Sequence, residues 1–172
     1  MNLDTATGIV GRVASLHLHP ADPGQPLANV QSIQVVAGKG ILGEPRYFGR
    51  VNANGKPGRR QVSLIEREQV AGHAATLGLE SIPPGAARAN IETLGVPLVP
   101  LVGRRIEIGD AVLFLSEPRT PCSKMDAVCP GLRFLMENNH QGVIAQVLKS
   151  GCIRVNDPIR LAKIPLSLKT QP

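Results

Sequence analysis

Short apolar runs alternate along the chain with Gly, Pro, Asn and Asp, a pattern typical of β-strands joined by tight turns. The runs are four to ten residues long and rich in Val, Ile and Leu. They predict strands over residues 9–18, 30–37, 61–65, 105–108, 111–116, 143–148 and 159–162. Gly109 and Asp110 separate two of these runs by the two residues that a hairpin turn requires.

Two segments favour helices instead. A helix is predicted over 66–77, because Ser63 and Glu66 have capping-box spacing and Gly78 can end it. A second helix is predicted over 131–139, where apolar residues recur at helical spacing after a proline. Many strands, two helices and no regular strand–helix alternation favour a mainly β fold, a closed or partly open β-barrel with two or more short helices.

Two segments rich in Gly, Pro and Asn, 19–28 and 49–60, are predicted loops. The second is long and basic. Long loops inside compact domains often bind ligands, so it is a candidate lid, and the alternative is a surface excursion without function. The length of 172 residues fits a single domain, and the chain contains no internal repeat.

The composition narrows the classes of partner. Hydrophobic residues make up 42% and charged residues 19%, which is typical of a folded globule. The net charge of +6 suits an anionic small molecule, nucleic acid or a membrane surface. The chain has no Trp, one Tyr, three Phe and no long basic run, which argues against nucleic acid as a partner. No leader or 18-residue apolar stretch is found, so we expect a cytoplasmic protein without a membrane partner.

Common catalytic motifs are missing: there is no phosphate loop, G-x-G-x-x-G, G-x-S-x-G or H-E-x-x-H. The three cysteines lack paired-ligand spacing and are expected to be free thiols. His17 and His19 lie on one face of a predicted strand, with no Cys or carboxylate close in the sequence. They are either a metal-binding pair or, as we favour, surface histidines at the end of a strand.

The second half of the chain contains an ordered series of motifs. Arg88-x-Asn90-Ile-x-Thr93-x-Gly95 comes first, Ile-Gly-Asp-Ala-Val-Leu (108–113) follows, and Pro-Cys ends at Cys122. Gly-Val-Ile-Ala-Gln-Val-Leu and Gly-Cys-Ile complete the series. It resembles the MOSC domain, the C-terminal module of molybdenum-cofactor sulfurases, which also occurs alone in small bacterial proteins. The resemblance covers about residues 30–163 of one domain spanning 1–172 and implies a MOSC-type β-barrel.

The resemblance also implies a function centred on Cys122. In reductases of the family, such as the mitochondrial amidoxime-reducing component, the equivalent cysteine is a thiolate ligand of molybdenum, and in the sulfurases it relates to sulfur transfer. This implies an oxidoreductase that binds molybdenum cofactor and acts on small N-hydroxylated substrates. Because three cysteines are too few for a four-thiolate cluster, electrons would come from a separate donor protein. The alternative is a non-redox carrier of sulfur or cofactor that holds a persulfide on Cys122.

The residues around Cys122 favour this chemistry independently of the family. A soft thiolate suits a soft transition metal or a persulfide. Arg119 and Lys124 flank Cys122, and neighbouring cations stabilise a thiolate. The alternative is a small buried hydrophobe, which we favour for Cys129 and Cys152 because they lie near predicted structural elements.

A pterin cofactor carries a phosphate and needs donors. Arg88 and Asn90 lie two residues apart on a predicted strand and therefore on one face. Arg supplies a charged fork for phosphate, and Asn can donate to and accept from a pterin edge. Thr93 and Thr120 add hydroxyl groups. The alternatives are a surface charge for Arg88 and a turn residue for Asn90.

The chain departs from the family pattern at residues 43–47 (Gly-Glu-Pro-Arg-Tyr), where standalone members usually carry Gly-Asp near a His. Glu44 keeps a carboxylate and Arg46 keeps a positive charge, but no histidine lies between His19 and His73. Any proton transfer that relatives assign to that histidine is not carried over. Anion binding here is instead expected from Lys39, Arg46, Arg59 and Arg60.

Overall fold

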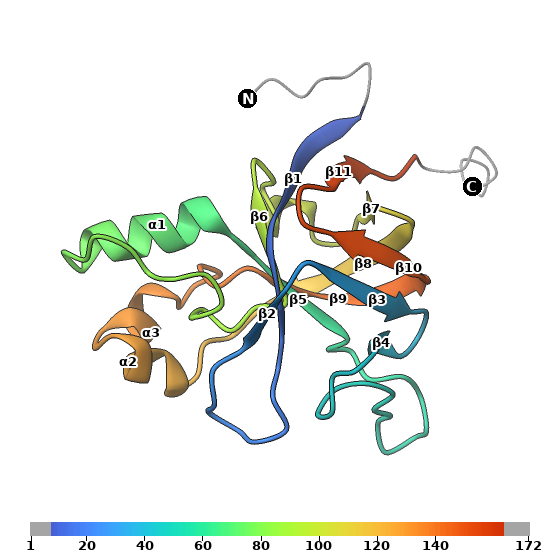
Figure 1. Cartoon of the computed structure of the whole chain (residues 1–172), viewed down its shortest axis with the longest axis horizontal. Coiled ribbons are helices and arrows are strands. Elements are labelled where there is room, and N and C mark those ends of the chain that lie inside the picture. Colours follow the sequence, from blue (N-terminus) through green and yellow to red (C-terminus); the bar gives the residue numbers. More distant parts are fainter. Residues whose placement is uncertain (1–7, 164–172) are drawn as a thin grey trace, which may run out of the picture.

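The computed structural model describes residues 8–163, most of which lie in strands or in the loops between them (Figure 1). The strands are β1 (Ile9–Leu18), β2 (Ala28–Val30), β3 (Ser32–Val36), β4 (Gly40–Ile41), β5 (Val62–Glu66), β6 (Ile91–Leu94), β7 (Arg105–Ile108), β8 (Ala111–Pro118), β9 (Val143–Lys149), β10 (Gly151–Arg154) and β11 (Pro158–Leu161). The helices are α1 (Arg67–Thr76), α2 (Lys124–Val128), α3 (Leu132–Leu135) and the 3₁₀ turn η1 (Val99–Leu101).

The main sheet closes on itself as a barrel. Its strands follow the order β11-β7-β8-β9-β5-β6-β1, and β1 pairs back onto β11. The pairs are antiparallel except β5 with β6, which run parallel because α1 lies in the connection between them. Strand β2 pairs with the end of β1, and β10, β3 and β4 form a second, small sheet. The predicted barrel is therefore confirmed, and it is closed.

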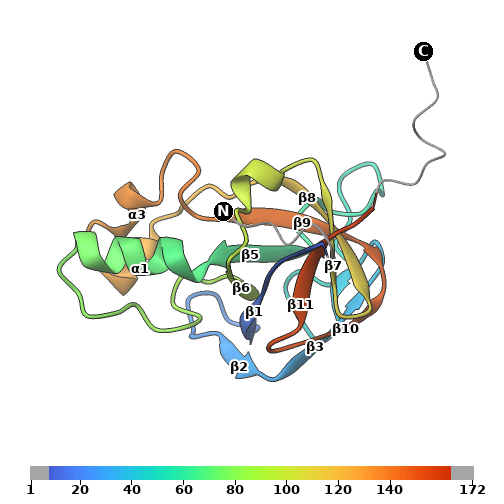
Figure 2. The same cartoon turned by 90° about the horizontal axis from the view of Figure 1, so that it is seen from above.

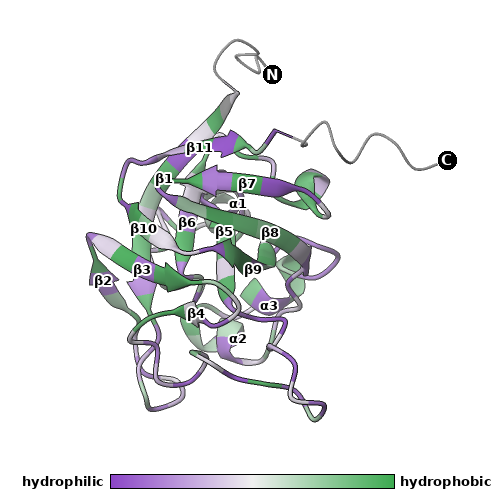
Figure 3. Ribbon diagram, turned by 90° about the vertical axis from the view of Figure 1, so that its right-hand side faces the viewer, coloured by the Kyte–Doolittle hydropathy of each residue, from purple (hydrophilic) through white to green (hydrophobic). Residues whose placement is uncertain are grey.

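Inward-facing side chains at alternate strand positions fill the barrel interior. Every second residue is buried in β7, in the first five residues of β8 and in the first residues of β9. Figure 3 shows β8 and β9 coloured mostly as hydrophobic. The inward residues are no more than 2% exposed: Ile106, Ile108, Ala111, Leu113, Leu115, Val143, Ala145 and Val147. Burial of each large aliphatic side chain contributes roughly 1.5–3 kcal/mol, so this interior is the main source of stability.

A second apolar cluster lies outside the barrel, under the helices that gather at one end of the molecule (Figure 2). Met125 of α2 and Leu132 of α3 are at most 1% exposed and pack with Val70 of α1 and Ile65 of β5. Through Met125, this cluster fixes α2, the helix that begins two residues after Cys122. Within residues 8–163, no helix combines the length and the apolar character needed to cross a membrane.

Most predicted elements are found, with several corrections. Strands are present at all seven predicted positions, but the run over 30–37 is divided at Gln31 into β2 and β3, which pair with different partners. The helix predicted over 131–139 ends at Leu135, because the residues that follow turn and two asparagines adopt positive φ. Five short elements lie outside the predicted ranges: β4, β6, β10, α2 and η1.

The predicted capping box is wrong. Ser63 is fully buried inside β5, where its Oγ donates a hydrogen bond to Asn90 Oδ1 at 2.9 Å. The apolar run continues through Ile65, so the strand extends to the start of α1. Glu66 occupies the N-cap without a capping bond from its side chain, and its carboxylate accepts from the backbone N–H of Leu98 at 2.7 Å.

Candidate functional site

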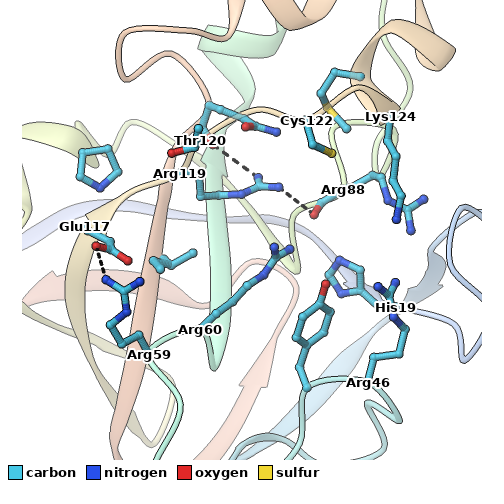
Figure 4. Close-up of a pocket in the computed structure, with 15 residues that line it drawn as sticks. His19, Arg46, Arg59, Arg60, Arg88, Glu117, Arg119, Thr120, Cys122 and Lys124 are labelled. Atoms are coloured by element: carbon cyan, nitrogen blue, oxygen red, sulfur yellow. Dashed lines mark hydrogen bonds and ion pairs between the residues drawn. The ribbon is translucent and has the colours of Figure 1, made fainter. Parts of the chain in front are cut away.

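A cavity of about 360 Å³ opens beside Cys122, where β8 ends and β9 begins (Figure 4). Its walls come from segments that are far apart in the sequence: the end of β1, the turns after β4, the residues before β5 and β6, and the connection from β8 to α2. The lining residues are His19, Arg46, Tyr47, Arg59, Arg60, Arg88, Glu117, Pro118, Arg119, Thr120, Cys122, Lys124, Met125, Gln141 and Ile144.

The lining is strongly cationic. Five arginines and Lys124 face a single carboxylate, Glu117, counted over the described residues. Glu117 is already bonded to Arg59 at 3.0 Å, and both side chains are exposed, so this pair is screened by solvent. The remaining five cations have no carboxylate among the lining residues within 8–163. Such a concave, single-sign lining concentrates field lines and attracts anions.

Arg119 is the most deeply placed of these cations, with 8% of its surface exposed. Its guanidinium donates to three backbone carbonyl oxygens, those of Arg88 (3.1 Å), Ala87 (3.4 Å) and Gln141 (3.4 Å), as the dashed lines in Figure 4 partly show. Burial, with a smaller contribution from the Arg60 guanidinium, lowers the pKa of Arg119 to about 9. A buried cation held by neutral acceptors favours an anionic ligand that supplies the missing charge.

Arg88 has an unusual backbone. Its φ of 57° lies in the left-handed region, which costs a non-glycine residue about 1–3 kcal/mol. The backbone is held by the bond from its N–H to the Gly85 carbonyl (2.9 Å) and by Arg119 on its own carbonyl. Its Nη1 donates to the Gln25 carbonyl at 2.8 Å, whereas Nη2 is buried without a partner within residues 8–163. Burial and the nearby Arg46 lower the pKa of Arg88.

The Tyr47 ring contacts three other side chains on one wall of the cavity. The guanidinium of Arg60 lies 4.6 Å from its ring centroid and that of Arg46 lies 5.3 Å away, both within the range of a cation–π interaction. The His19 ring meets the Tyr47 ring edge-on at 5.1 Å. The only tyrosine of the chain thus orders two of the cations against β1.

His19 and His17 are buried, at 3% and 0% exposure, so the expectation of surface histidines is wrong. His19 Nδ1 lies 2.9 Å from Oε1 of Glu44, which is 2% exposed. His19 lines the cavity, and its Nε2 has no hydrogen-bond partner in the described part of the chain. Sequence reasoning missed this pair because the two residues come from different segments, 25 positions apart.

Cys122 is exposed in the stretch between Pro118 and α2, and with Thr120 and Lys124 it forms one rim of the cavity. Cys129 and Cys152 are only partly exposed, and neither lines the cavity. The structure therefore brings Arg46, Arg88, Thr120 and Lys124 together around Cys122. Arg59 and Arg60 of the basic loop also line it, whereas Lys39 does not.

Asn90 and Thr93 do not line this cavity. Residues 88–90 precede β6 rather than forming a strand, so alternation does not place Arg88 and Asn90 on one face. Asn90 is 3% exposed; its Oδ1 accepts from the backbone N–H of Ser63 (3.0 Å), and its Nδ2 donates to Glu44. Thr93 is fully buried and donates to the Ile65 carbonyl. Both residues support the walls of the barrel.

Residues 8–163 contain no group of three or more His, Cys, Asp and Glu side chains that could hold a metal ion. Among the residues that line the cationic cavity, Cys122 offers a thiol as a soft donor.

The chain forms a closed β-barrel with a cationic cavity beside an exposed cysteine, an arrangement whose charge suits anionic ligands. The family model of the MOSC domain matches residues 23–160. The chain belongs to the MOSC domain family, as its motifs predict.

Solved structures confirm the fold. The YuaD protein of Bacillus subtilis superposes with a TM-score of 0.72 at 22% identity, over 87% of this chain and 93% of that one. YiiM of Geobacillus stearothermophilus superposes with a TM-score of 0.64 at 18% identity, over 92% of this chain and 76% of that one. YiiM of Escherichia coli superposes with a TM-score of 0.63 at 18% identity, over 89% of this chain and 70% of that one. A search of curated proteins found no match.

Proposed function

We propose that the chain binds molybdenum cofactor in the cationic cavity, with Cys122 as a ligand of molybdenum, and reduces N-hydroxylated compounds. The observation that carries this proposal is the cavity itself. Six basic side chains converge on an exposed thiol, and two of them, Arg88 and Arg119, have buried guanidinium atoms that no carboxylate within residues 8–163 neutralises.

The residues fit such a cofactor in two respects. A phosphate-bearing ligand needs charged donors, which the guanidinium groups of Arg88 and Arg119 supply. Arg88 Nη2 is a buried donor that awaits an acceptor. A thiolate at Cys122 is a suitable soft ligand for molybdenum, and its exposure at the rim leaves it accessible.

When bound, the cofactor would supply two-electron redox chemistry at its metal. The chain's own residues bind and orient the cofactor. Arg88 and Arg119 hold the phosphate, and Tyr47 covers one wall with Arg60 stacked on it. His19, whose Nδ1 is engaged by Glu44, has Nε2 as the ring nitrogen that can hold a proton.

The overall reaction defines what partners are needed. Cleavage of an N–O bond consumes two electrons and two protons and releases water and the N–H product. The substrate is a small molecule. The three free cysteines of this chain are too few to hold a four-thiolate iron–sulfur cluster, so the electrons come from a separate donor protein.

The test is turnover of benzamidoxime by cofactor-loaded wild type and Cys122→Ser with a chemical reductant. We expect turnover by wild type only, with unchanged thermal unfolding in the variant, because Cys122 is exposed and lies outside the apolar clusters. Cys152→Ser is the matched control and should remain active. Turnover retained by Cys122→Ser would refute the ligand role.

The exposure of Cys122 favours a second candidate, a carrier of sulfur or cofactor. A thiolate at an open rim can attack a donor persulfide, so that the outer sulfur passes to Cys122 and the donor leaves as a thiolate. On this alternative, wild type shows no turnover with any reductant. It gains the mass of one sulfur atom when mixed with a persulfide donor, and Cys122→Ser does not.

A further inference from the structure

A second hollow, of about 480 Å³, adjoins the cationic cavity on the side of the basic loop 49–60. We call it the basic groove; its lining residues are Tyr47, Arg50, Val51, Asn52, Gly58, Arg59, Arg60 and Ile144. Half of them, Tyr47, Arg59, Arg60 and Ile144, also line the cavity, so the two compartments share one wall. The other half comes entirely from the basic loop and belongs to the groove alone.

The segment that forms the groove holds most of the net positive charge of the chain. Residues 39–60 contain six basic residues and one acidic residue, which gives a net charge of +5 against +6 for all 172 residues. The basic residues are Lys39, Arg46, Arg50, Lys56, Arg59 and Arg60. The acidic residue, Glu44, is buried and lines neither compartment. Such a one-sided charge distribution attracts anions to this surface.

The basic loop is an ordered hairpin. Its two arms are joined by the bond from the Gly58 N–H to the Arg50 carbonyl (2.8 Å), and its tip is closed by the bond from the Asn52 N–H to the Lys56 carbonyl (2.8 Å). At its base, the buried Gln61 donates from Nε2 to the Gly58 carbonyl at 3.0 Å and accepts a backbone N–H of β9 at 2.8 Å. A backbone that is already ordered loses little entropy when it binds a ligand.

Arg60 belongs to both compartments. Its guanidinium lies 4.6 Å from the centroid of the Tyr47 ring, which holds it in place, and it points toward Arg119 in Figure 4. The charge of Arg60 also contributes, after burial, to the lowered pKa of Arg119, so the two cations are within electrostatic reach of each other. A negative group between them would relieve this repulsion.

Arg50 adds a cation that belongs to the groove alone. It is exposed and has no ion-pair partner within residues 8–163, whereas the neighbouring Arg59 is paired with Glu117 at 3.0 Å. No carboxylate lines the groove in this part of the chain. Unpaired cations therefore continue from the deep Arg119 through Arg60 to Arg50, along a path that a single phosphate group in the cavity leaves partly unused.

We propose that the basic groove binds a second phosphate group of a ligand whose first phosphate lies in the cationic cavity, so that the ligand carries at least two linked phosphates. The first phosphate meets Arg88 and Arg119, Arg60 lies at the shared wall, and the next phosphate meets Arg50. Because the two anionic groups are linked, the second contact forms at a high effective concentration. This inference goes beyond the proposed function and does not rest on it, since it concerns anion binding and no redox step.

Titration calorimetry on the protein as isolated, at about 0.15 M salt and without divalent cations, tests the second subsite. Inorganic phosphate, pyrophosphate and tripolyphosphate are the probes. We expect pyrophosphate or tripolyphosphate to bind at least about tenfold more tightly than phosphate, through the linked second contact. In NMR spectra, the Val51 methyl groups and the Gly58 amide should shift with these longer anions and not with phosphate.

Two variants of the same hairpin separate a built site from diffuse charge. Arg50→Gln should reduce the gain of the longer anions to less than about threefold and leave the affinity for phosphate unchanged, because Arg50 lines only the groove. Lys56→Gln is the matched control, since Lys56 is exposed, carries the same charge and lines neither compartment. It should keep the gain of wild type.

Methyl diphosphate distinguishes the two sources of a diphosphate. Affinity equal to that of pyrophosphate supports an organic diphosphate ester as the ligand, and a weaker affinity supports the free anion; both results keep the second phosphate in the groove.

Equal affinities of phosphate, pyrophosphate and tripolyphosphate overturn the proposed subsite. An equal loss of the gain in Arg50→Gln and Lys56→Gln also overturns it, because the gain would then come from the overall charge of the segment. The proposed reaction is tested separately, by turnover of benzamidoxime. Failure of that turnover leaves the calorimetric result unchanged, so the two proposals fail by different measurements.

Discussion

His19 Nδ1 lies 2.9 Å from Glu44 Oε1, and the same oxygen accepts the backbone N–H of His19 at 2.7 Å. The two side chains are almost fully buried, at 2% and 1% exposure. Asn90 Nδ2 donates to that oxygen as well. One carboxylate thus sits directly behind a histidine that lines the cationic cavity, where water screens its charge poorly.

Glu44→Gln removes this charge but keeps an oxygen that can accept the same bonds. An anion in the cavity is repelled by Glu44, so we expect the variant to bind sulfate about three- to tenfold more tightly at low salt, as a buried charge at this range can produce. Isothermal titration calorimetry measures the change. Glu117→Gln is the control: its carboxylate is exposed and paired with Arg59, and its effect should be smaller. Unchanged affinity in Glu44→Gln would show that its charge does not reach the cavity.

Local sequence patterns were sufficient for six of the seven barrel strands, all except β6. Alternating apolar residues mark the inward face of β7 and β8, and Gly109-Asp110 forms the predicted two-residue connection between Ile108 and Ala111. Strand β4 has only two residues and is too short to show a period, so it could not be predicted. Strand pairing was also out of reach, because the parallel contact of β5 with β6 depends on where α1 packs.

Proximity in sequence predicted one part of the candidate site, whereas Arg46 and Arg88, which also line the cavity, were expected from comparison with the family pattern. Arg119, Cys122 and Lys124 are neighbours along the chain and also in the cavity. His19 and Glu44 meet only through the fold. Asn90 was misplaced because alternation assumes a strand, whereas the positive φ of Arg88 turns the backbone just before β6.

Gly85 is required by both its backbone and its surroundings. Its φ is 85°, and a Cβ placed there would lie 2.9 Å from Nδ1 of the buried His17. Gly103 has the same φ of 85° with no atom within 4 Å of such a Cβ, so it is a matched control for backbone strain alone. We expect Gly103→Ala to cost about 1 kcal/mol in free energy of unfolding and Gly85→Ala about 2–4 kcal/mol. Urea denaturation compares them; equal losses would mean that His17 moves aside freely.

His17 should make stability depend on pH. Burial lowers the pKa of His17 from its ordinary value, although Glu92 opposes the shift. A histidine whose pKa is lower in the folded state contributes stability that is complete above its unfolded pKa, near 6.5, and is lost as the pH falls through the folded pKa. The loss approaches about 1.4 kcal/mol per pH unit between the two pKa values.

Denaturation at pH 7.5, 6.5 and 5.5 measures this dependence. We expect wild type to lose more stability on acidification than His17→Gln, which has no group to protonate there. His140→Gln, at an exposed histidine, should keep the slope of wild type. A slope that is the same in all three proteins would assign the acid sensitivity to other groups.

The lowered pKa of Arg119 predicts how anion binding responds to alkaline pH. Burial, with a smaller contribution from Arg60, lowers its pKa to about 9, and only the protonated guanidinium attracts an anion. A bound anion favours the protonated form, so the dissociation constant should rise as the pH passes about 9, by up to tenfold per unit. Sulfate is a suitable probe because its own charge is constant over this range.

Titration calorimetry with sulfate at pH 7.5, 9 and 10 tests the role of Arg119 against the rest of the cavity. Arg119→Met should bind sulfate at least about tenfold more weakly at pH 7.5, since it lacks a buried charged fork, and should weaken less between pH 9 and 10. Arg104→Met, at an exposed arginine outside the cavity, should reproduce both the affinity and the pH response of wild type. Weakening above pH 9 that is identical in wild type and Arg119→Met would show that another group causes it, and the deep cation would then serve the fold rather than the ligand.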